Sequence, residues 1–369
     1  MRRMRVALVT DNYPGHGQAG GIATYTQVVA RCLVRLGHDV HVFAGGGSGV
    51  DVEAGVIRHM VPPVGDAGAL GPVIEQVAAR GGPFDVLETP EFRALGAVAV
   101  GRRDIARCLT VRLHGAETIL GHRPEMWSDR PENPELAVTH AADVVTAPSL
   151  AAVQMTDDAW GSDLRSRAIV VPNPGPEVMP LAEVRPRYDL GFFGRLEPRK
   201  GVDVLARVLA DIGRPLSVVV AGADHPWGDG ETGLGLLRSS GATVTYLGVL
   251  DHDEVMTALN RVRIAVVPSR RESFGLTLLE AMAAGVPAVG TDIPAFRELV
   301  GGSGGVELLP LEDPAAWSAQ IRRWLDLPGV AREAGRVARV RAQAFSPMSV
   351  TRALHDAWTS ADRRSVLTA

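Results

Sequence analysis

The feature that most constrains the fold of this chain is a strand–helix alternation that runs twice, once on each side of a proline-rich segment. The first series places helical patterns such as 22–37 between short apolar runs at 5–10, 39–45, 85–89, 107–114 and 143–149. Residues 170–189 are rich in proline and have no period, which is typical of a linker. The alternation then restarts, with apolar runs at 189–194, 216–222, 244–248, 263–269 and 288–292. Apolar strands that alternate with helices indicate parallel sheets covered by helices on both faces.

The length of 369 residues exceeds the size at which a single core stops growing, so we expect two domains. The predicted fold class is α/β, with two facing Rossmann-like doubly wound domains and a cleft between them. We place the N-terminal domain at 1–180 and the C-terminal domain at 181–345. We expect 346–369 to form an amphipathic helix that packs back onto the first domain. In such domains ligands bind at the carboxyl ends of the strands.

Composition narrows the function classes. The formal charge of −4 gives no broad basic field, so we expect no nucleic-acid partner. No apolar run approaches the length of a membrane span, and the first apolar run is too short for a signal peptide. We therefore expect a cytoplasmic protein without an integral membrane segment. Cys32 and Cys108 fall in separate elements and are expected in the core rather than in a disulfide. No CxxC or HExxH motif occurs, so we expect no metal site.

Two loops of the second half carry candidate binding groups. In FFGRLEPRKGVDVL, residues 192–205, Arg195 and Lys200 lie between a strand and a helix, where two cations can bind a diphosphate. A solvated turn explains these residues about equally well. The loop lacks GxxxxGK[ST], which argues against an ordinary nucleoside triphosphatase.

The second loop, SRRESFGLTLLEAMAAGVP at 269–287, places Glu272 before a helix and Glu280 inside it. The helix is expected to begin at Gly275, with the free N–H groups of its first turn above the strand ends. An acid in the first turns of a helix is commonly a complement to the helix dipole. That explanation covers Glu280 but not Glu272.

The first half offers weaker signals. The loop at 10–25 contains Gly15, Gly17, Gly20 and Gly21, which let the backbone approach a ligand closely. It is not GxGxxG, so the nicotinamide fingerprint is absent. His114 ends a strand at the expected ligand edge, although a lone histidine is more often structural.

Together these motifs resemble the retaining GT-B glycosyltransferases of family 4 over nearly the whole chain. GRLEPRKGVDVL is similar to the GRL…KG…L segment of that family, and PSRRESFGLTLLEAMAAGVPAVGTDIPAFRELV is similar to its E-x7-E segment. AGGIATYTQVVARCLVRLGHDVHVFA resembles its first helix and second strand.

The resemblance implies a hexosyl or N-acetylhexosaminyl transferase (EC 2.4) that needs no cofactor or metal and uses a UDP- or GDP-linked sugar as co-substrate. It implies four catalytic residues: His114 near the reacting carbon, Arg195 and Lys200 on the donor diphosphate, and Glu272 on the sugar hydroxyls. Its further donor contacts are Glu280 with the ribose, Gly248 and Val249 near the base, Gly20 and Gly21 near the diphosphate, and the backbone of Phe274, Gly275, Leu276 and Thr277.

DVLETPEF at 85–92 departs from many relatives, because it carries Glu88 and Glu91. With Asp11 and Glu117 these acids predict an acidic acceptor pocket, which suits a small soluble acceptor such as an aminosugar, an aminocyclitol or another secondary metabolite. A solvated loop is the plainer explanation. Three other functions remain open: transfer to a cell-envelope glycan or glycolipid, a sugar-nucleotide epimerase, and a non-catalytic binding subunit. The segment 70–82 is not basic, which argues against a lipid-linked acceptor.

Overall fold

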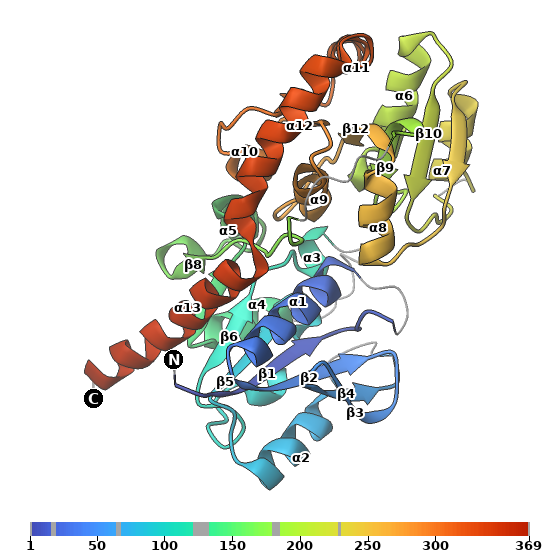
Figure 1. Ribbon diagram of the computed structural model, residues 1–369. Coiled ribbons are helices and arrows are strands. Elements are labelled where there is room, and N and C mark those ends of the chain that lie inside the picture. The colour runs from blue at the N-terminus through green and yellow to red at the C-terminus, as the bar shows by residue number, and fades with distance from the viewer. Residues whose placement is uncertain are drawn as a thin grey trace. The chain divides into compact units, whose positions relative to one another are not determined.

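The structure, a computed structural model, describes residues 2–15, 20–63, 68–120, 133–178, 185–227 and 230–367, with side chains described to residue 360 (Figure 1). It divides into two compact units. Unit 1 is Met1–Pro174 together with Pro347–Ala369, and unit 2 is Gly175–Ser346. The predicted boundary at residues 180 and 181 lies outside the described residues.

The described strands of unit 1 all lie between residues 5 and 170. Its strands are β1 (Arg5–Thr10), β2 (Asp39–Gly45), β3 (Gly49–Glu53), β4 (Val56–Val61), β5 (Val86–Pro90), β6 (Leu109–Arg112), β7 (Val144–Ala147) and β8 (Ala168–Val170). Its α-helices are α1 (Gly21–Arg35), α2 (Gly71–Gly81), α3 (Glu117–Leu120), α4 (Pro134–Ala141), α5 (Leu150–Trp160) and α13 (Pro347–Leu367).

In the described part of unit 1, the sheet has the order β3-β4-β2-β1-β5-β6-β7-β8. All neighbouring pairs are parallel except β3 and β4, which form an antiparallel hairpin at the edge. The strand order reverses between β1 and β5, and the carboxyl edge at such a reversal is where doubly wound domains bind ligands. The sequence pattern predicted β1, β2, β5, β6 and β7 but missed this hairpin and the short edge strand β8.

Alternate residues of each central strand enter different cores. Val6 and Leu8 of β1 join the core that includes α1 and α13, whereas Ala7 and Val9 join the core that includes α2. Both faces of the sheet are therefore covered, as continuous apolar strands predict. The helix α13 packs against α1 and places the buried Trp358 in the same core.

Unit 2 is a second doubly wound domain. Its strands are β9 (Tyr188–Phe193), β10 (Ser217–Ala221), β11 (Thr243–Tyr246), β12 (Val262–Val267), β13 (Ala288–Thr291) and β14 (Val306–Leu309). Its α-helices are α6 (Val202–Ile212), α7 (Gly233–Ser239), α8 (His252–Leu259), α9 (Leu276–Ala284), α10 (Pro294–Val300), α11 (Pro314–Asp326) and α12 (Pro328–Ala342).

The described strands of unit 2 pair in the order β11-β10-β9-β12-β13-β14, all parallel. The order reverses between β9 and β12. Ile264 and Val266 of β12 face the core with α6 and α11, and Ala265 and Val267 face the core with α9 and α10. The two units confirm the predicted class of two parallel-sheet, Rossmann-like α/β domains.

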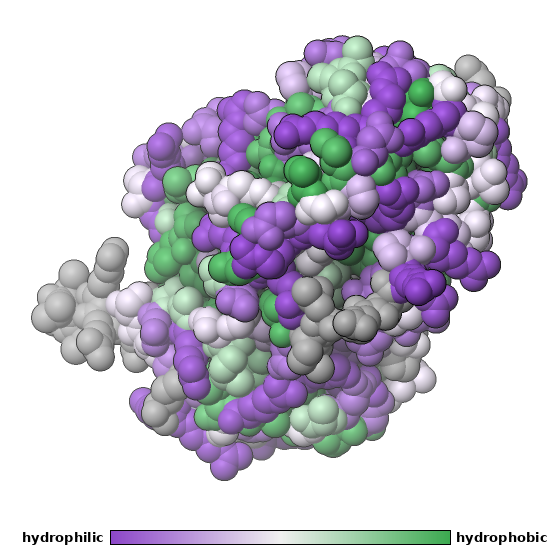
Figure 2. All heavy atoms as spheres, turned by 45° about the horizontal axis from the view of Figure 1, so that its top comes forward, coloured by the Kyte–Doolittle hydropathy of each residue, from purple (hydrophilic) through white to green (hydrophobic). Residues whose placement is uncertain are grey.

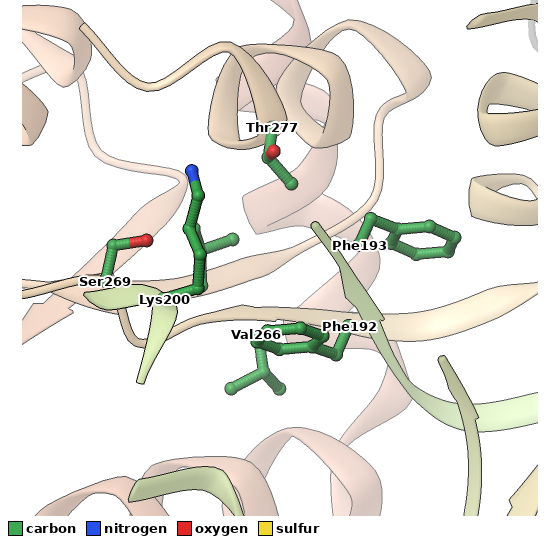
Figure 3. Close-up of a pocket in the computed structure, with 7 residues that line it drawn as sticks. Phe192, Phe193, Lys200, Val266, Ser269 and Thr277 are labelled. Carbon is green, nitrogen blue, oxygen red and sulfur yellow. The ribbon is translucent and has the colours of Figure 1, made fainter. Parts of the chain in front are cut away.

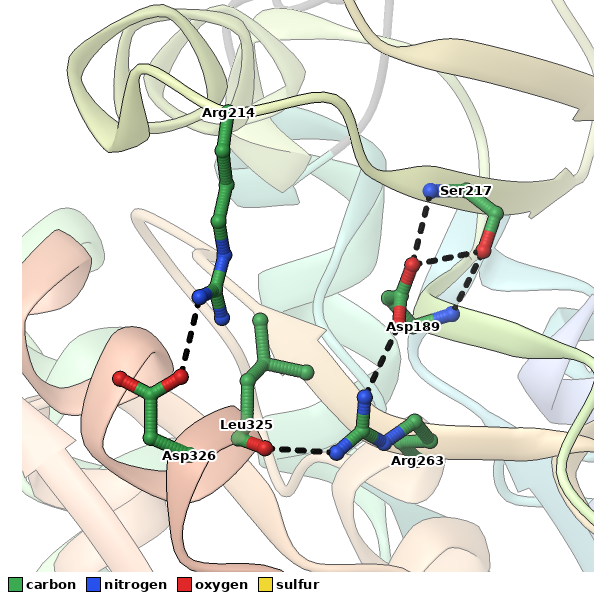
Figure 4. A network of polar contacts seen from close by, with 6 residues as sticks. All are labelled: Asp189, Arg214, Ser217, Arg263, Leu325 and Asp326. Carbon is green, nitrogen blue, oxygen red and sulfur yellow. Dashed lines mark hydrogen bonds and ion pairs between the residues drawn. The ribbon is translucent and has the colours of Figure 1, made fainter.

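A polar network ties the amino ends of the strands of unit 2 together (Figure 4). The Asp189 carboxylate accepts hydrogen bonds from the Ser217 backbone N–H at 3.0 Å and from the Ser217 hydroxyl at 2.8 Å. The Arg263 guanidinium pairs with Asp189 at 3.1 Å and donates to the Leu325 carbonyl at 2.7 Å. Strands β9, β10 and β12 are thereby joined to α11 at the end of the sheet away from the carboxyl edge.

The surface mixes residue types. Figure 2 shows hydrophilic and hydrophobic residues interspersed over the face in view, with the hydrophobic ones in small separate groups. Among the helices that the structure describes, none has both the length and the apolar character needed to cross a bilayer. Neither cysteine forms a disulfide; Cys32 is buried in α1, as predicted, whereas Cys108 is only half-buried just before β6.

Candidate active site

The loops after β9 and β12 bring Lys200 and Glu272 together at the reversal of strand order in unit 2. The two residues are 72 positions apart in sequence, yet the Lys200 Nζ lies 2.6 Å from the Glu272 Oε1. Gly201 permits this approach: its φ is +72°, and a Cβ there would lie 1.8 Å from the Pro268 carbonyl oxygen. The fold therefore places a cation and a carboxylate in contact at the edge where ligands bind.

Two further charged residues of the same loop, Glu197 and Arg199, complete the cluster, and neither was predicted from the motifs. Arg199 lies 3.8 Å from Glu272 and 2.9 Å from Glu197, which also pairs with Arg195 at 3.3 Å. The Arg195 side chain keeps 42% of its surface exposed, so an anion in solution can reach its guanidinium. The signal was visible in the spacing of charges within RLEPRK, which alternates cations with an acid.

The electrostatics of this cluster keep Glu272 ionised. Burial would raise the pKa of Glu272, but the charges of Lys200 and Arg199 outweigh burial and hold the pKa below its usual value. An ionised carboxylate accepts hydrogen bonds and donates none, so Glu272 is suited to binding hydroxyl groups.

The helix α9 begins directly above this pair. Gly275 is its N-cap, with a φ of +107°, and a Cβ there would lie 2.5 Å from the Phe296 ring. Helix amino ends leave backbone N–H groups free for an anion. Phe274 is buried and packs against Phe345 with ring centroids 5.8 Å apart, so only its backbone can serve a ligand.

A small hollow lies between the loops and α9. Figure 3 shows the Lys200 side chain extending between Ser269 and Thr277, toward the end of α9 that carries Thr277. The hollow is lined by Phe192, Phe193, Lys200, Val266, Val267, Ser269 and Thr277. In this view (Figure 3) Phe192 and Val266 lie below the base of the Lys200 side chain, and its nitrogen points away from them.

Glu280 lies one turn inside α9 and has a partner that the motifs did not predict. The His252 Nδ1, at the first residue of α8, lies 3.3 Å from the Glu280 Oε1. The hydrogen bond to Glu280 raises the pKa of His252 above its usual value. Gly248 and Val249 lie on the loop just before α8; the Gly248 carbonyl accepts from the Gly222 N–H at 2.7 Å, and Val249 is exposed.

In unit 1, the predicted donor glycines lie at the start of α1. Gly20 is the N-cap, with no side-chain cap, and Gly21 is the first helical residue. A Cβ at Gly20 would meet nothing within 4 Å, so the space beside it is open. Gly17, in the same predicted loop, lies outside the described residues.

His114 follows β6 and contacts α1. Its ring lies 4.8 Å from the Tyr25 ring in an edge-to-face arrangement. Burial, with a smaller contribution from the Arg112 charge, holds the pKa of His114 well below its usual value. The imidazole is therefore neutral at pH 7 and can donate from one nitrogen and accept at the other.

The four acids predicted to form an acceptor pocket do not form an open acidic surface. Glu88 is buried and accepts a hydrogen bond from the Tyr25 hydroxyl at 2.8 Å. Glu91 and Glu117 are also buried; Glu91 binds backbone N–H groups, and Glu117 pairs with Arg93 at 3.1 Å. Asp11 alone is partly exposed, and burial raises its pKa. Of the four acids predicted to form an acceptor pocket, three therefore bond to groups of unit 1 itself, and only Asp11 keeps part of its surface exposed.

The described residues contain no group of three or more His, Cys, Asp and Glu side chains arranged to hold a metal ion. The clusters at the two strand reversals instead combine cations, single carboxylates and backbone N–H groups. In unit 2 this combination suits an anion that carries hydroxyl groups.

Comparison with known proteins agrees with this geometry. The family model "Glycosyltransferase Family 4" matches residues 19–174, and "Glycosyl transferases group 1" matches residues 187–326. A D-inositol 3-phosphate glycosyltransferase from Geodermatophilus obscurus is 32% identical, over 87% of this chain and 82% of that protein. A glycogen synthase from Mycobacterium tuberculosis is 36% identical over 44% of this chain and 40% of that protein.

Solved structures share the fold at lower identity. Sucrose-phosphate synthase from Thermosynechococcus elongatus matches with a TM-score of 0.77 and 20% identity, and the match covers all of both chains. HepE of Anabaena, in complex with UDP and glucose, matches with a TM-score of 0.73 and 19% identity, over 97% of this chain and 100% of that chain.

Two doubly wound domains with this cluster in the second define the GT-B class of glycosyltransferases. The chain belongs to the group 1 glycosyltransferases of family 4, so it is an enzyme of the transferase class.

Proposed function

We propose that the protein is a retaining transferase that moves a sugar from a nucleoside diphosphate to a hydroxyl group of a small soluble acceptor. The observation that carries the proposal is the Lys200–Glu272 contact of 2.6 Å beneath the amino end of α9. An anion and a hydroxyl-bearing ring are the two ligand parts that such a cluster binds together.

Each group of unit 2 has a role in this reaction. Charge builds up on the leaving diphosphate in the transition state, where Arg195, Lys200 and the N–H groups of α9 stabilise it. Glu272 accepts hydrogen bonds from hydroxyls of the transferred sugar. Glu280 accepts from the ribose, and the loop of Gly248 and Val249 lies against the base. No metal takes part in this proposal.

Retention of configuration, which is part of this proposal, can arise by two mechanisms, and the groups of unit 1 favour one of them. In this proposal the neutral His114 contacts the donor sugar near its anomeric carbon. A double displacement needs a carboxylate nucleophile near that carbon, but Glu88, Glu91 and Glu117 are buried and bonded internally. We therefore propose a front-face substitution, in which a donor phosphate oxygen takes the proton of the acceptor hydroxyl as the sugar transfers. Trapping of a covalent glycosyl-enzyme would contradict this step.

The acceptor class is proposed from the relatives. The Geodermatophilus relative is named for D-inositol 3-phosphate, a small phosphorylated polyol. A soluble polyol, aminosugar or aminocyclitol fits the same chemical class.

The test is a thermal-shift panel of UDP-, GDP-, dTDP- and ADP-sugars without added metal. A ligand that binds only the folded state stabilises it by about 2.7 kcal/mol at 100 times its Kd. We expect a selective rise in Tm with one nucleotide, a loss of that rise in Glu272→Ala, and no loss in the exposed control Glu333→Gln. Release of free nucleotide only when an acceptor is present then distinguishes a transferase from an epimerase. No shift with any donor, with or without magnesium, would refute the proposal.

A further inference from the structure

Two buried carboxylates hold the loop that carries His114. Both oxygens of Glu91 accept from the His114 backbone N–H at 2.9 Å, and its Oε1 also accepts from the Gly115 N–H at 2.7 Å. The carboxylate of Glu135 takes the next N–H groups, those of Glu117 at 2.9 Å and Thr118 at 3.2 Å. Both carboxylates are completely buried. The backbone of this loop is thus satisfied by side chains rather than by a helix or a sheet.

The segment after Glu91 is strained, and the same network holds it. Arg93 and Ala94 have φ values of 55° and 51°, in the left-handed region that side chains disfavour. Such a conformation costs about 1–2 kcal/mol per residue, so surrounding contacts must stabilise it. The Arg93 N–H donates to Glu135 at 2.8 Å, and its guanidinium pairs with Glu117 at 3.1 Å. Backbone strain of this kind clusters at functional sites, so its presence at the ligand edge of the sheet favours a functional role for this loop.

The imidazole of His114 contacts a tyrosine ring. Tyr25 of α1 contacts the ring at 4.8 Å between centroids, and the Tyr25 hydroxyl is held by Glu88 at 2.8 Å. Glu91 therefore holds the position of the His114 backbone, while Tyr25 limits the orientation of the His114 ring. The two acids of DVLETPEF thus both act on His114, Glu91 through its backbone N–H and Glu88 through Tyr25.

We propose that Glu91 is a positioning residue, whose buried carboxylate binds the backbone of His114 and Gly115 and so orients the imidazole for sugar transfer. This inference rests on the proposed function, in which His114 contacts the donor sugar. Small errors in the placement of a reacting group are costly to rate, so a residue that only orients can change kcat strongly.

The charge of Glu91 adds a pH signature. Burial, together with the facing charge of Glu135 on α4, raises the pKa of Glu91 to about 7. Below that pH the Glu91 carboxyl gains a proton. It then has less capacity to accept the three hydrogen bonds from the His114 and Gly115 N–H groups. The His114 ring beside it stays neutral through this range. Transfer is therefore expected to fall as the pH drops through about 7 because Glu91 titrates.

The experiment compares Glu91→Gln and Glu91→Asp with the wild type and with Glu75→Gln, a control on α2 whose side chain is 44% exposed. An amide has one acceptor oxygen, and its NH2 group opposes the backbone N–H groups. We expect Glu91→Gln to lower kcat by about tenfold or more while the donor KM and the nucleotide-induced rise in Tm stay within twofold. Its activity is expected to be flat with pH below 7, and Glu91→Asp is expected to recover part of the rate.

A second readout does not depend on activity. Backbone N–H groups that donate to a carboxylate have displaced NMR resonances, so Glu91→Gln is expected to shift the His114 and Gly115 amides, and Glu75→Gln is not. A wild-type kcat and pH profile in Glu91→Gln, or unmoved amides, would overturn the proposal. A lower Tm with an unchanged kcat would do the same, since it marks a purely structural role.

The experiment still tests the proposal if a variant does not fold or if the wild type has no transferase activity. If Glu91→Gln does not fold, Glu91→Asp carries the kcat and NMR comparisons, because a shorter acid moves the loop without removing the charge; its rate is still expected to fall as the pH drops. If the wild type binds no nucleotide and transfers no sugar, the proposed function fails. The His114 and Gly115 amide resonances still decide whether Glu91 binds the backbone of His114.

Discussion

Replacing Lys200 with methionine tests how much of the stability of unit 2 depends on one buried ion pair. The Glu272 side chain keeps only 11% of its surface exposed, and its Oε1 lies 2.6 Å from the Lys200 Nζ. At that distance, an effective dielectric constant of about 20 gives an attraction of about 6 kcal/mol, before the desolvation of both groups is subtracted. Arg199 remains 3.8 Å from Glu272 and offsets part of the loss. We expect Lys200→Met to lower the free energy of unfolding by about 3 kcal/mol.

The double variant provides the internal control for this prediction. Lys200→Met leaves a buried carboxylate without its nearest cation, whereas Lys200→Met/Glu272→Gln leaves no such charge. The double variant is therefore expected to be more stable than Lys200→Met alone, with a coupling free energy of at least about 1 kcal/mol. The exposed pair Glu333–Arg336, 2.7 Å apart on α12, is the matched control, and its removal is expected to have no measurable effect.

The assay is urea unfolding followed by pulsed hydrogen exchange and mass spectrometry, which reports peptides of unit 2 separately from those of unit 1. The pH dependence adds a second check. The pKa of Glu272 is lowered in the folded state, so its stabilising contribution is present above the unfolded value of about 4.3 and is lost as the pH falls through the folded value. Lys200→Met should weaken that acid dependence. An unfolding free energy within about 0.5 kcal/mol of the wild type, or a double variant as unstable as the single one, would refute this reasoning.

Three other predictions concern stability. Gly201→Ala is expected to lower the free energy of unfolding by at least about 2 kcal/mol in the same urea assay, because its Cβ would clash with the Pro268 carbonyl; a neutral effect would contradict the close approach of the two loops. Asp189→Ala is expected to lose about 1–2 kcal/mol in unit 2, because Ser217 loses its acceptor, and Asp189→Asn should lose less. Burial lowers the pKa of His59 to about 4, so the ring is neutral when folded, and stability is lost as the pH falls from about 6.5 toward 4. The Tm should fall over that window, and less so in His59→Phe; equal slopes would count against it.

The strands were predictable because parallel strands buried on both faces leave long apolar runs. The runs at 5–10 and 39–45 coincide with β1 and β2, and the expected helix at 22–37 differs from α1 by one or two residues at each end. The β3–β4 hairpin was missed because β3, Gly49–Glu53, alternates valines with acidic residues at a sheet edge and is almost wholly exposed. An edge strand buries few apolar side chains, so it leaves no clear hydrophobic pattern in the sequence.

The candidate site was predictable where a motif fixes both residue type and position. Glu272 and Lys200 lie together as the motifs imply. The motifs do not predict which residue pairs with each charged side chain. His252 reaches Glu280 from another helix, and Glu91 bonds to backbone groups of a loop 23 residues away. Such contacts depend on how loops fold back over strand ends, and no local pattern encodes them. The acids of unit 1 were for this reason expected to line an acceptor pocket, although Glu88, Glu91 and Glu117 bind groups of the protein itself.

The helix α13 has a consequence for how the chain acquires its structure during synthesis. Unit 1 is interrupted: its sheet comes from the first 174 residues, but Leu354 and Trp358 of its core come from beyond residue 346. Unit 2 is continuous and is complete before these residues are made. During synthesis, the apolar face of α1 against which α13 packs therefore stays uncovered at least until the residues beyond 346 have been made. The core of unit 1 is then expected to be completed only after unit 2 has been synthesised, because the segments of unit 1 lie on both sides of unit 2 in the sequence.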